Sequence, residues 1–246
     1  MDYKVNSVSD NRVFVETESY RRLLEALEVM REYRGNILHV VGAPGTGKSA
    51  NLYRGIQEAG LDVYEVPCNL ESADVSADYV FRRLLDEMKE ELGAYTREDL
   101  YRKLAGFDAV VFADRFHDSH DFSEFMGFSQ WTATAGSETL KFYIRCIHEY
   151  IRNRREFRKM NIIFQTAWRF YFRGKKLDIF TDIPIISSAL FNFLRIPFTA
   201  VRIDYTITET LNIIKAHSGA DEEEIRRYIE LYGCRPRTVL EKMRSC

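Results

Sequence analysis

The sequence lacks most of the features that mark disordered, secreted or membrane-spanning chains. It holds only 5 prolines and no low-complexity run, which argues against long disordered linkers. No window approaches the length of a membrane span, and the first residues contain no apolar segment of the kind that a secretory signal requires. We therefore expect a globular cytoplasmic chain that does not enter a membrane.

Closely spaced cysteines and a strong overall charge are also missing. The 4 cysteines lie far apart and form no Cys-x-x-Cys pair, which is typical of free thiols in a reducing compartment. The formal net charge is −2, so the chain as a whole does not indicate a polyanionic partner. The charge is uneven, however, because 11 Lys or Arg residues stand against 2 Glu residues between Lys141 and Lys176.

Short apolar runs alternate with segments in which apolar residues recur at helical spacing. Residues 208–244 contain helical patterns only. Strands that alternate with helices predict an α/β fold with three layers around a mostly parallel sheet. We expect this domain in residues 1–205 and a small helical lid in residues 206–246. The apolar runs predict five strands, at residues 36–41, 61–66, 109–113, 161–166 and 199–203.

The stretch GAPGTGKS, from Gly42 to Ser49, fits the phosphate-loop (P-loop) pattern G-x-x-x-x-G-K-[ST] throughout. It follows a predicted strand and opens a predicted helix, which is the context that this motif requires. Its glycines let backbone N–H groups curve around a phosphate, and the helix N-terminus adds its dipole. Lys48 brings a charge for the β- and γ-phosphates, and Ser49 brings a hydroxyl for Mg²⁺. We expect ATP or ADP to contact Gly42, Ala43, Pro44, Gly45, Thr46, Gly47, Lys48, Ser49 and Ala50.

The order of the strands distinguishes two branches of P-loop proteins. In the simplest P-loop kinases, the strand with the metal-binding aspartate lies next to the P-loop strand. In the other branch, an extra strand with a sensor residue at its tip separates them. The run VVFAD ends at Asp114 on the third predicted strand, and NIIFQT, residues 161–166, forms the fourth. Five parallel strands in this order favour the second branch.

Together these motifs resemble an AAA+-type ATPase module, of the archaeal group that includes STAND-like ATPases and replication-initiator ATPases. The resemblance covers residues 12–244. It implies that Asp114 and Ser49 lie near Mg²⁺, and that Gln165 or Thr166 faces the γ-phosphate. It also implies that ATP binding and hydrolysis drive a conformational change on a protein or nucleic-acid partner, or within a homo-oligomer.

The segment YGCRPRTVLEKM resembles the sensor 2 region of such lids, which makes Arg237 the candidate lid arginine. Pro236 suits the first turn of a helix, where its missing N–H costs nothing. The helix dipole disfavours the positive charge of Arg237 at a helix N-terminus, and a nearby phosphate would offset that unfavourable interaction. The alternative is that Arg237 is a solvated surface residue.

One position departs from the family pattern, because Arg115 follows Asp114 where a glutamate usually orients the attacking water. One explanation is that Asp118, Asp121 or Glu124 substitutes for the missing glutamate. Another is that hydrolysis is slow and the bound nucleotide serves as a switch. A third explanation is that Arg115 itself acts electrostatically on a phosphate. We favour slow or substituted hydrolysis, with Asp118 as the substitute.

The same loop, RFHDSHD, also contains side chains that bind transition metals, namely His117, Asp118, His120 and Asp121. It directly follows the strand end assigned to Mg²⁺, and loop residues of these types are usually solvated. We therefore do not expect a separate zinc-type site.

The basic region 141–176 allows three interpretations. It interleaves arginines with aromatic residues, a combination that suits salt-dependent, sequence-independent contact with nucleic acid. Within the 246 residues no winged-helix pattern follows the lid, so we expect no base-specific contact. Alternatively, Arg169, Arg173 and Arg195 serve as phosphate sensors. The third interpretation is a helix with a solvated basic face and one apolar face, formed by Phe142, Ile144, Ile147 and Ile151, while the aromatic residues pack in the core.

These observations predict an ATPase module that couples nucleotide state to the lid and a partner. The alternative is a nucleotide-dependent switch or scaffold with little turnover, which the missing glutamate supports. A small-molecule kinase is a further alternative, in which RNRREFRK, residues 152–159, forms a lid over the acceptor. The helical segment after residue 206 argues against this last function.

Overall fold

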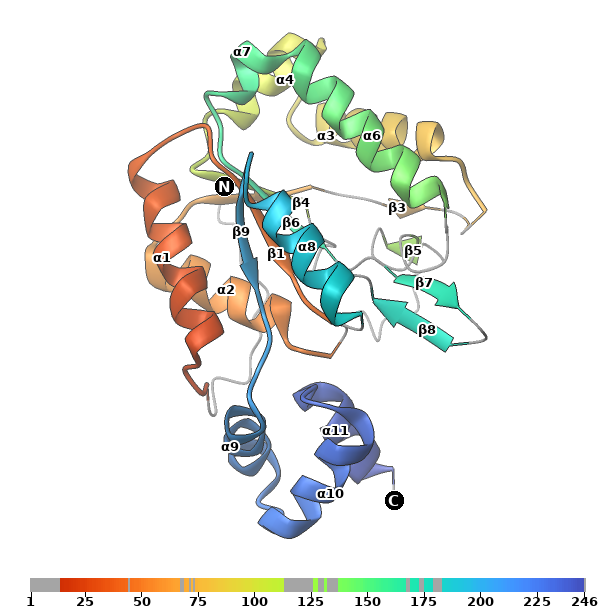
Figure 1. Cartoon of the computed structure of the whole chain (residues 1–246). Helices are drawn as coiled ribbons and strands as arrows, with labels where there is room; N and C mark the ends of the chain where they lie inside the picture. Colours follow the sequence, from red (N-terminus) through yellow and green to blue (C-terminus); the bar gives the residue numbers. More distant parts are fainter. Residues whose placement is uncertain are drawn as a thin grey trace.

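The computed structural model describes most of the chain, and Figure 1 shows the arrangement of its helices and strands. The described residues are 14–43, 45–66, 69–70, 72, 74–112, 126–127, 131, 137–166, 169–172, 175–178 and 183–245. Among them, no helix has the length and the apolar composition needed to cross a bilayer.

A five-stranded parallel sheet forms the centre of the molecule, in the order β2-β4-β6-β1-β9. The P-loop strand β1 therefore pairs with β6, and β6 separates it from β4, the strand that precedes Asp114. All five strands predicted from the sequence are confirmed, each within two residues at its ends. The strand bounds are β1 (Ile37–Val41), β2 (Val63–Glu65), β4 (Ala109–Phe112), β6 (Ile162–Thr166) and β9 (Thr199–Arg202).

One face of the sheet packs against two helices, α1 (Glu18–Glu32) and α2 (Lys48–Ala59). Alternate residues of the strands, such as Leu38 and Val40 of β1, join the apolar residues of α1 and α2 in one buried cluster. Thr17 caps α1 by accepting a hydrogen bond from the Tyr20 N–H, and Gly60 ends α2 in the left-handed region.

The opposite face carries a second layer of helices, which completes the three-layer α/β arrangement expected from the sequence. Residues from α3, α4 and α6 form one cluster with Tyr64, Val110 and Ile162 of the sheet. The helix α8 lies over β9, where the Arg202 guanidinium donates to the carbonyl of Ser187. The helices of this layer are α3 (Ala77–Glu91), α4 (Arg97–Leu104), α6 (Ser137–Arg152), α7 (Arg154–Phe157) and α8 (Pro184–Leu194).

Two small antiparallel pairs were not predicted from the sequence. They are β3 (Asn69–Leu70) with β5 (Met126–Gly127), and β7 (Arg169–Phe172) with β8 (Lys175–Asp178). Each of these strands spans only two to four residues, which is too short for an alternating pattern to stand out. The helix that carries Phe142, Ile144, Ile147 and Ile151 begins at Ser137, and Asn153 separates it, as α6, from the short α7.

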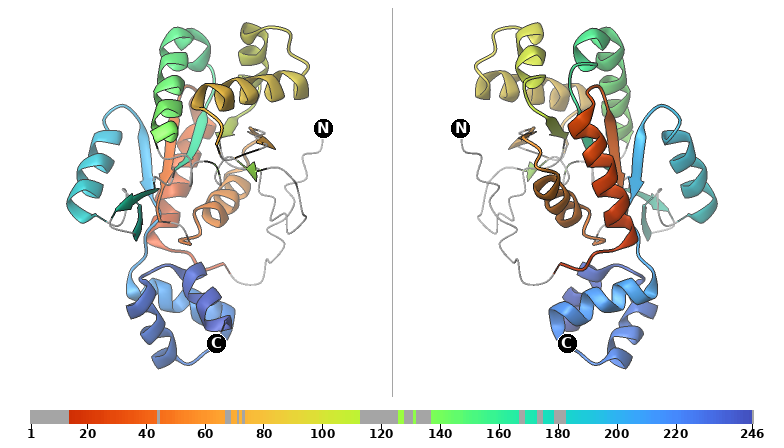
Figure 2. Two further views of the ribbon diagram at one scale, coloured as in Figure 1. Left: turned by 90° about the vertical axis from the view of Figure 1, so that its right-hand side faces the viewer. Right: turned by 90° about the vertical axis from the view of Figure 1, so that its left-hand side faces the viewer.

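Three C-terminal helices, α9 (Ile207–Ser218), α10 (Glu222–Tyr232) and α11 (Pro236–Arg244), form a lid with its own small core. Figures 1 and 2 show this lid as a separate group of helices at the end of the sheet toward which β9 points. Thr206 and Glu209 form a capping box at the start of α9, and Pro236 occupies the first turn of α11. The buried residues of its core are Leu211, Ile214, Ile225, Ile229 and Val239.

Candidate functional site

The P-loop lies between the end of β1 and the start of α2. Gly45 and Gly47 have φ angles of 84° and 75°, in the left-handed region that glycine adopts without strain. Gly47 is the N-cap of α2, so the free N–H groups of the first turn of the helix follow the loop directly. The sequence prediction of a strand, a glycine loop and a helix is thus confirmed. Pro44 lies outside the described residues.

Lys48 is buried, and its ammonium folds back on the loop that precedes it. The Nζ atom donates to the carbonyl oxygens of Gly42 and Ala43, at 2.7 and 3.1 Å. Thr46 stabilises the same turn, since its hydroxyl donates to the Ala43 carbonyl at 2.8 Å. A buried cation needs such acceptors, and an incoming phosphate would provide stronger ones.

Ser49 and Gln165 connect the P-loop helix to the tip of β6. The Gln165 Nε2 group donates to Ser49 Oγ at 2.5 Å. The Gln165 Oε1 atom is buried and has no hydrogen-bond partner among the described residues. A buried acceptor of this kind requires a donor, and a water beside Mg²⁺ or a phosphate would supply one. The residues present therefore fit a nucleotide with its metal.

A second contact with the P-loop comes from Asn51 and Tyr205, which sequence reasoning missed. The Asn51 Nδ2 group donates to the Gly47 carbonyl and to the Tyr205 hydroxyl, both at 2.8 Å. Burial raises the pKa of Tyr205 to about 12, so this hydroxyl stays protonated at neutral pH. No motif marks either residue, because their partnership depends on where β9 lies beside α2.

The lid also contacts the P-loop through its last helix. The Arg237 N–H, at the start of α11, donates to the Gly45 carbonyl at 3.1 Å. A Cβ on Gly45 would lie 2.4 Å from Thr238 Oγ1, which shows how closely the two segments approach. The Arg237 side chain is 69% exposed, and its Nε donates to Glu241 at 2.9 Å. The predicted role of Arg237 on phosphate thus requires its guanidinium to leave Glu241.

The carboxylate of Glu209 joins the lid to the start of α1. It accepts hydrogen bonds from the N–H groups of Glu18 and Thr206, at 3.0 and 2.9 Å. Burial tends to raise the pKa of Glu209, but these hydrogen bonds outweigh it and hold the pKa below its ordinary value. Nearby, Ser19 Oγ donates to the backbone carbonyl of Asp204 at 2.6 Å.

Several predicted residues lie outside the described part of the chain. These are Asp114, Arg115, Asp118, Asp121 and Glu124, and also His117 and His120 of the alternative metal site. Thr166 ends β6, where it pairs with Val41, but its side chain is not described. Among the described residues, no group of three or more His, Cys, Asp or Glu residues could hold a metal.

The structure divides the basic region 141–176 among α6, α7 and the β7–β8 pair. Among its described side chains, three cations form ion pairs: Lys141 with Glu138, Arg145 with Asp78 and Lys159 with Glu156. The side chains of Arg169 and Arg173 are outside the described part. Arg195, just after α8, lies 5.9 Å from the Phe191 ring.

The sequence matches no protein-family model and no curated protein. Two solved structures are similar in fold at low sequence identity. One is the replication initiator DnaA bound to AMPPCP and single-stranded DNA, with 15% identity, 97% of this chain covered and a TM-score of 0.48. The other is AMPPCP-bound DnaA from Aquifex aeolicus, with 16% identity, 94% of this chain covered and a TM-score of 0.44. The aligned region spans 63% and 62% of those two chains, and such distant similarity does not reveal the activity of this protein.

Proposed function

We propose that this chain is an ATP-binding module of the AAA+ type, in which nucleotide bound at the P-loop controls the position of the helical lid. The observation that carries the proposal is the P-loop itself: its motif, its strand–loop–helix context and its two left-handed glycines. The strand order also supports it, because β6 lies between β1 and β4 as in the branch with a sensor strand.

Each P-loop residue has a task that its position supports. Lys48 would exchange two backbone carbonyls for the β- and γ-phosphates. Ser49 and Asp114 would hold Mg²⁺. When bound, Mg²⁺ neutralises negative charge on the phosphate oxygens. Gln165 would use its unsatisfied Oε1 to orient a water, and the polar contact with Ser49 would keep its amide in place.

Hydrolysis in this proposal is slow, because Arg115 replaces the usual glutamate, and Asp118 takes over part of its role. The test is a turnover assay with Mg²⁺ and ATP, together with a binding assay, on wild type, Lys48→Ala and Asp118→Ala. We expect Lys48→Ala to lose binding at least tenfold. We expect Asp118→Ala to retain binding and lose most of its turnover.

Three results would change the proposal in different ways. Equal ATP affinity in wild type and Lys48→Ala would remove the nucleotide site. If wild type binds ATP but releases no more phosphate than Lys48→Ala, the protein is a nucleotide-dependent switch, which is the second candidate. If Asp118→Ala hydrolyses ATP normally, another group orients the water. A gel shift at low and moderate salt tests the separate prediction of nucleic-acid contact through residues 141–176.

A further inference from the structure

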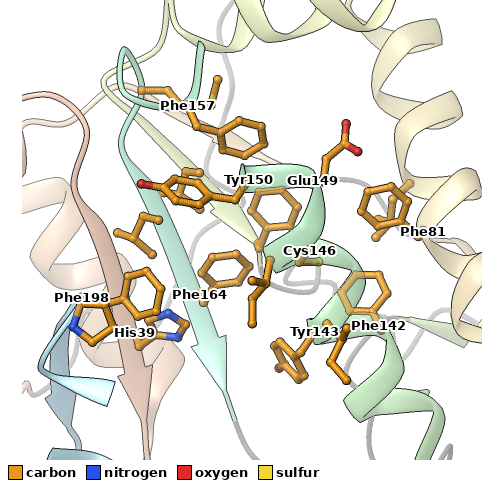
Figure 3. Close-up of a pocket in the computed structure, with 18 of the residues that line it drawn as sticks. His39, Phe81, Phe142, Tyr143, Cys146, Glu149, Tyr150, Phe157, Phe164 and Phe198 are labelled. Carbon is orange, nitrogen blue, oxygen red and sulfur yellow. The ribbon is translucent and has the colours of Figure 1, made fainter. Parts of the chain in front are cut away.

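Among the described residues, the second helical layer leaves part of the sheet uncovered. Between α6 and α8, four rings lie side by side across neighbouring strands and form what we call the aromatic row: Phe112, Phe164, His39 and Phe198. Successive ring centroids are 5.1, 5.0 and 5.1 Å apart. The row forms the floor of a groove with a cavity of about 320 Å³ (Figure 3).

The walls of the groove are apolar and open to water. On α6, Leu140, Ile144 and Ile147 recur at helical spacing and line the groove, and Ile144 is 57% exposed. The sequence identified this apolar face by its spacing, and the structure shows that only Phe142 of its four residues is buried. On α8, Phe193 is 69% exposed, and no residue from Pro184 to Leu194 carries a charge.

The few polar groups that line the groove offer no charge to a ligand. Glu149 is buried and accepts hydrogen bonds from Tyr101, Arg97 and Asn153. Burial lowers the pKa of His39 to about 4, so its imidazole is neutral at physiological pH. An occupant must therefore present an apolar face to the groove.

Cations gather at one end of the groove. Arg152 ends α6, Arg154, Arg155 and Arg158 come directly after it, and Arg195 follows α8. The C-terminal ends of both helices lie on the same side in Figure 1. We call these five residues the basic end. All five are exposed, and none forms an ion pair with a described residue. Three other cations of the region are paired: Lys159 at the same end, and Lys141 and Arg145 in the first nine residues of α6. A partner with carboxylates would complement this end.

The shape of the groove indicates what kind of apolar surface fills it. A bilayer surface is broad and would leave a concave cavity empty, whereas protruding side chains fill one. The floor is the face of the sheet and presents side chains, whereas an added strand pairs with a backbone edge, which this sheet has at β2 and β9. The wall helix α6 has 16 residues and is about 24 Å long, which matches a helix of about four turns.

We propose that this groove docks an acidic amphipathic helix from a partner protein, with the apolar side chains of that helix on the aromatic row and its carboxylates at the basic end. This inference is independent of the nucleotide site, because the residues that line the groove include none of residues 42–49. It would make the module a nucleotide-binding protein with a defined partner surface.

The test is a selection of 16-residue peptides from a random library displayed on phage, with the full chain as bait. The counter-bait is the double variant Ile144→Lys/Phe193→Lys. We expect the enriched peptides to carry a net negative charge and apolar residues at i, i+3 or i+4, and i+7. The best synthetic peptide should bind the double variant at least tenfold more weakly. It should bind Arg152→Glu/Arg155→Glu severalfold more weakly, with a loss that shrinks as salt is raised.

Val29→Lys on α1 is the matched control, because Val29 is 47% exposed on the opposite side of the sheet. It should bind the peptide as wild type does. All variants are checked for an unchanged melting temperature, and the single variant Ile147→Ser replaces the double variant if the latter is unstable.

Other results would overturn the proposal. Enriched peptides without acidic residues, or equally bound by the double variant, would mean that the groove does not select such a helix. If the wild type floats with phosphatidylglycerol vesicles and the double variant does not, the groove is a membrane-binding surface. If the wild type is a dimer and the double variant is a monomer, the groove binds a second copy of this chain. A DNA gel shift lost in Arg152→Glu/Arg155→Glu, with no peptide enriched, would assign the basic end to nucleic acid.

Discussion

His39 is a histidine in an environment that opposes its protonation. Its ring stacks on Phe164 and borders Phe198, and burial lowers its pKa from 6.5 to about 4. In the unfolded chain the same imidazole takes up a proton near pH 6.5. Between these two pH values the unfolded state therefore binds more protons than the folded state, and stability falls as the pH is lowered from 6.5 to 4.

We predict that His39 accounts for a loss of up to about 3 kcal/mol across this pH window. The variant His39→Phe keeps an aromatic ring in the row and removes the titration, so its free energy of unfolding should depend less on pH between 7 and 4. Urea denaturation of both proteins at several pH values measures the difference. Parallel pH profiles for wild type and variant would show that His39 is not the group responsible.

The residues around the P-loop show why some site residues could be predicted from the sequence and others could not. Lys48 and Ser49 were predictable because a contiguous motif fixes their positions on a loop and a helix. Gln165 was predictable as a strand-tip residue, but its bond to Ser49 depends on β6 pairing with β1. Tyr205 carries no local signal at all, because its role arises from a contact with Asn51 across 154 positions.

At the scale of elements, strands and helices with long periodic patterns could be predicted, and short or unusual ones could not. The helices α2, α4 and α11 carry boundary signals that the sequence shows, namely Gly60 after α2, Thr96 before α4 and Pro236 at the start of α11. One interpretation of the sequence assigned an apolar stripe to the helix at this position, but periodicity identifies an apolar face and not what covers it. That is why the groove became apparent only when α6 and α8 were placed in space.

The contacts of Arg237 on α11 allow a test of whether its side chain binds phosphate. Its backbone N–H bonds to the P-loop, while its side chain pairs with Glu241 at i+4 on an exposed surface. Such a pair contributes only about 0.3–0.5 kcal/mol, so a phosphate at the loop could compete for the guanidinium.

If Arg237 closes the lid on nucleotide, Arg237→Ala should weaken ATP binding about tenfold, which corresponds to about 1.4 kcal/mol. Glu241→Gln frees the guanidinium and should leave affinity unchanged or increase it. Arg226→Ala is the matched control, because Arg226 pairs with Glu222 at i−4 on α10 of the same lid. Titration calorimetry measures all three variants. Unchanged affinity in Arg237→Ala would make Arg237 a surface residue, the alternative left open by the sequence.

On the scale of the whole molecule, the lid and the sheet domain meet through a small number of contacts around the P-loop. The Gly45 carbonyl accepts from α11, Asn51 reaches Tyr205 at the junction, and Glu209 bonds to the first N–H of α1. The core of the lid is separate and contains only five buried apolar residues. Two of these contacts involve the P-loop directly, since Gly45 accepts from Arg237 and Asn51 joins Gly47 to Tyr205.

Gly45 is the point at which this arrangement can be disturbed with one methyl group. Gly45→Ala places a Cβ 2.4 Å from Thr238 Oγ1 and 3.4 Å from its N, at a φ of +84°. Gly60→Ala is the matched control, because its φ is +64° but no atom lies within 4 Å of the added Cβ. Left-handed strain alone costs about 1–2 kcal/mol, so both variants should lose that much stability in urea denaturation.

Only Gly45→Ala should also push α11 away from the loop, weaken ATP binding and increase hydrogen exchange in residues 236–240. If the two variants bind ATP equally well, contact between the lid and the P-loop does not contribute to nucleotide affinity.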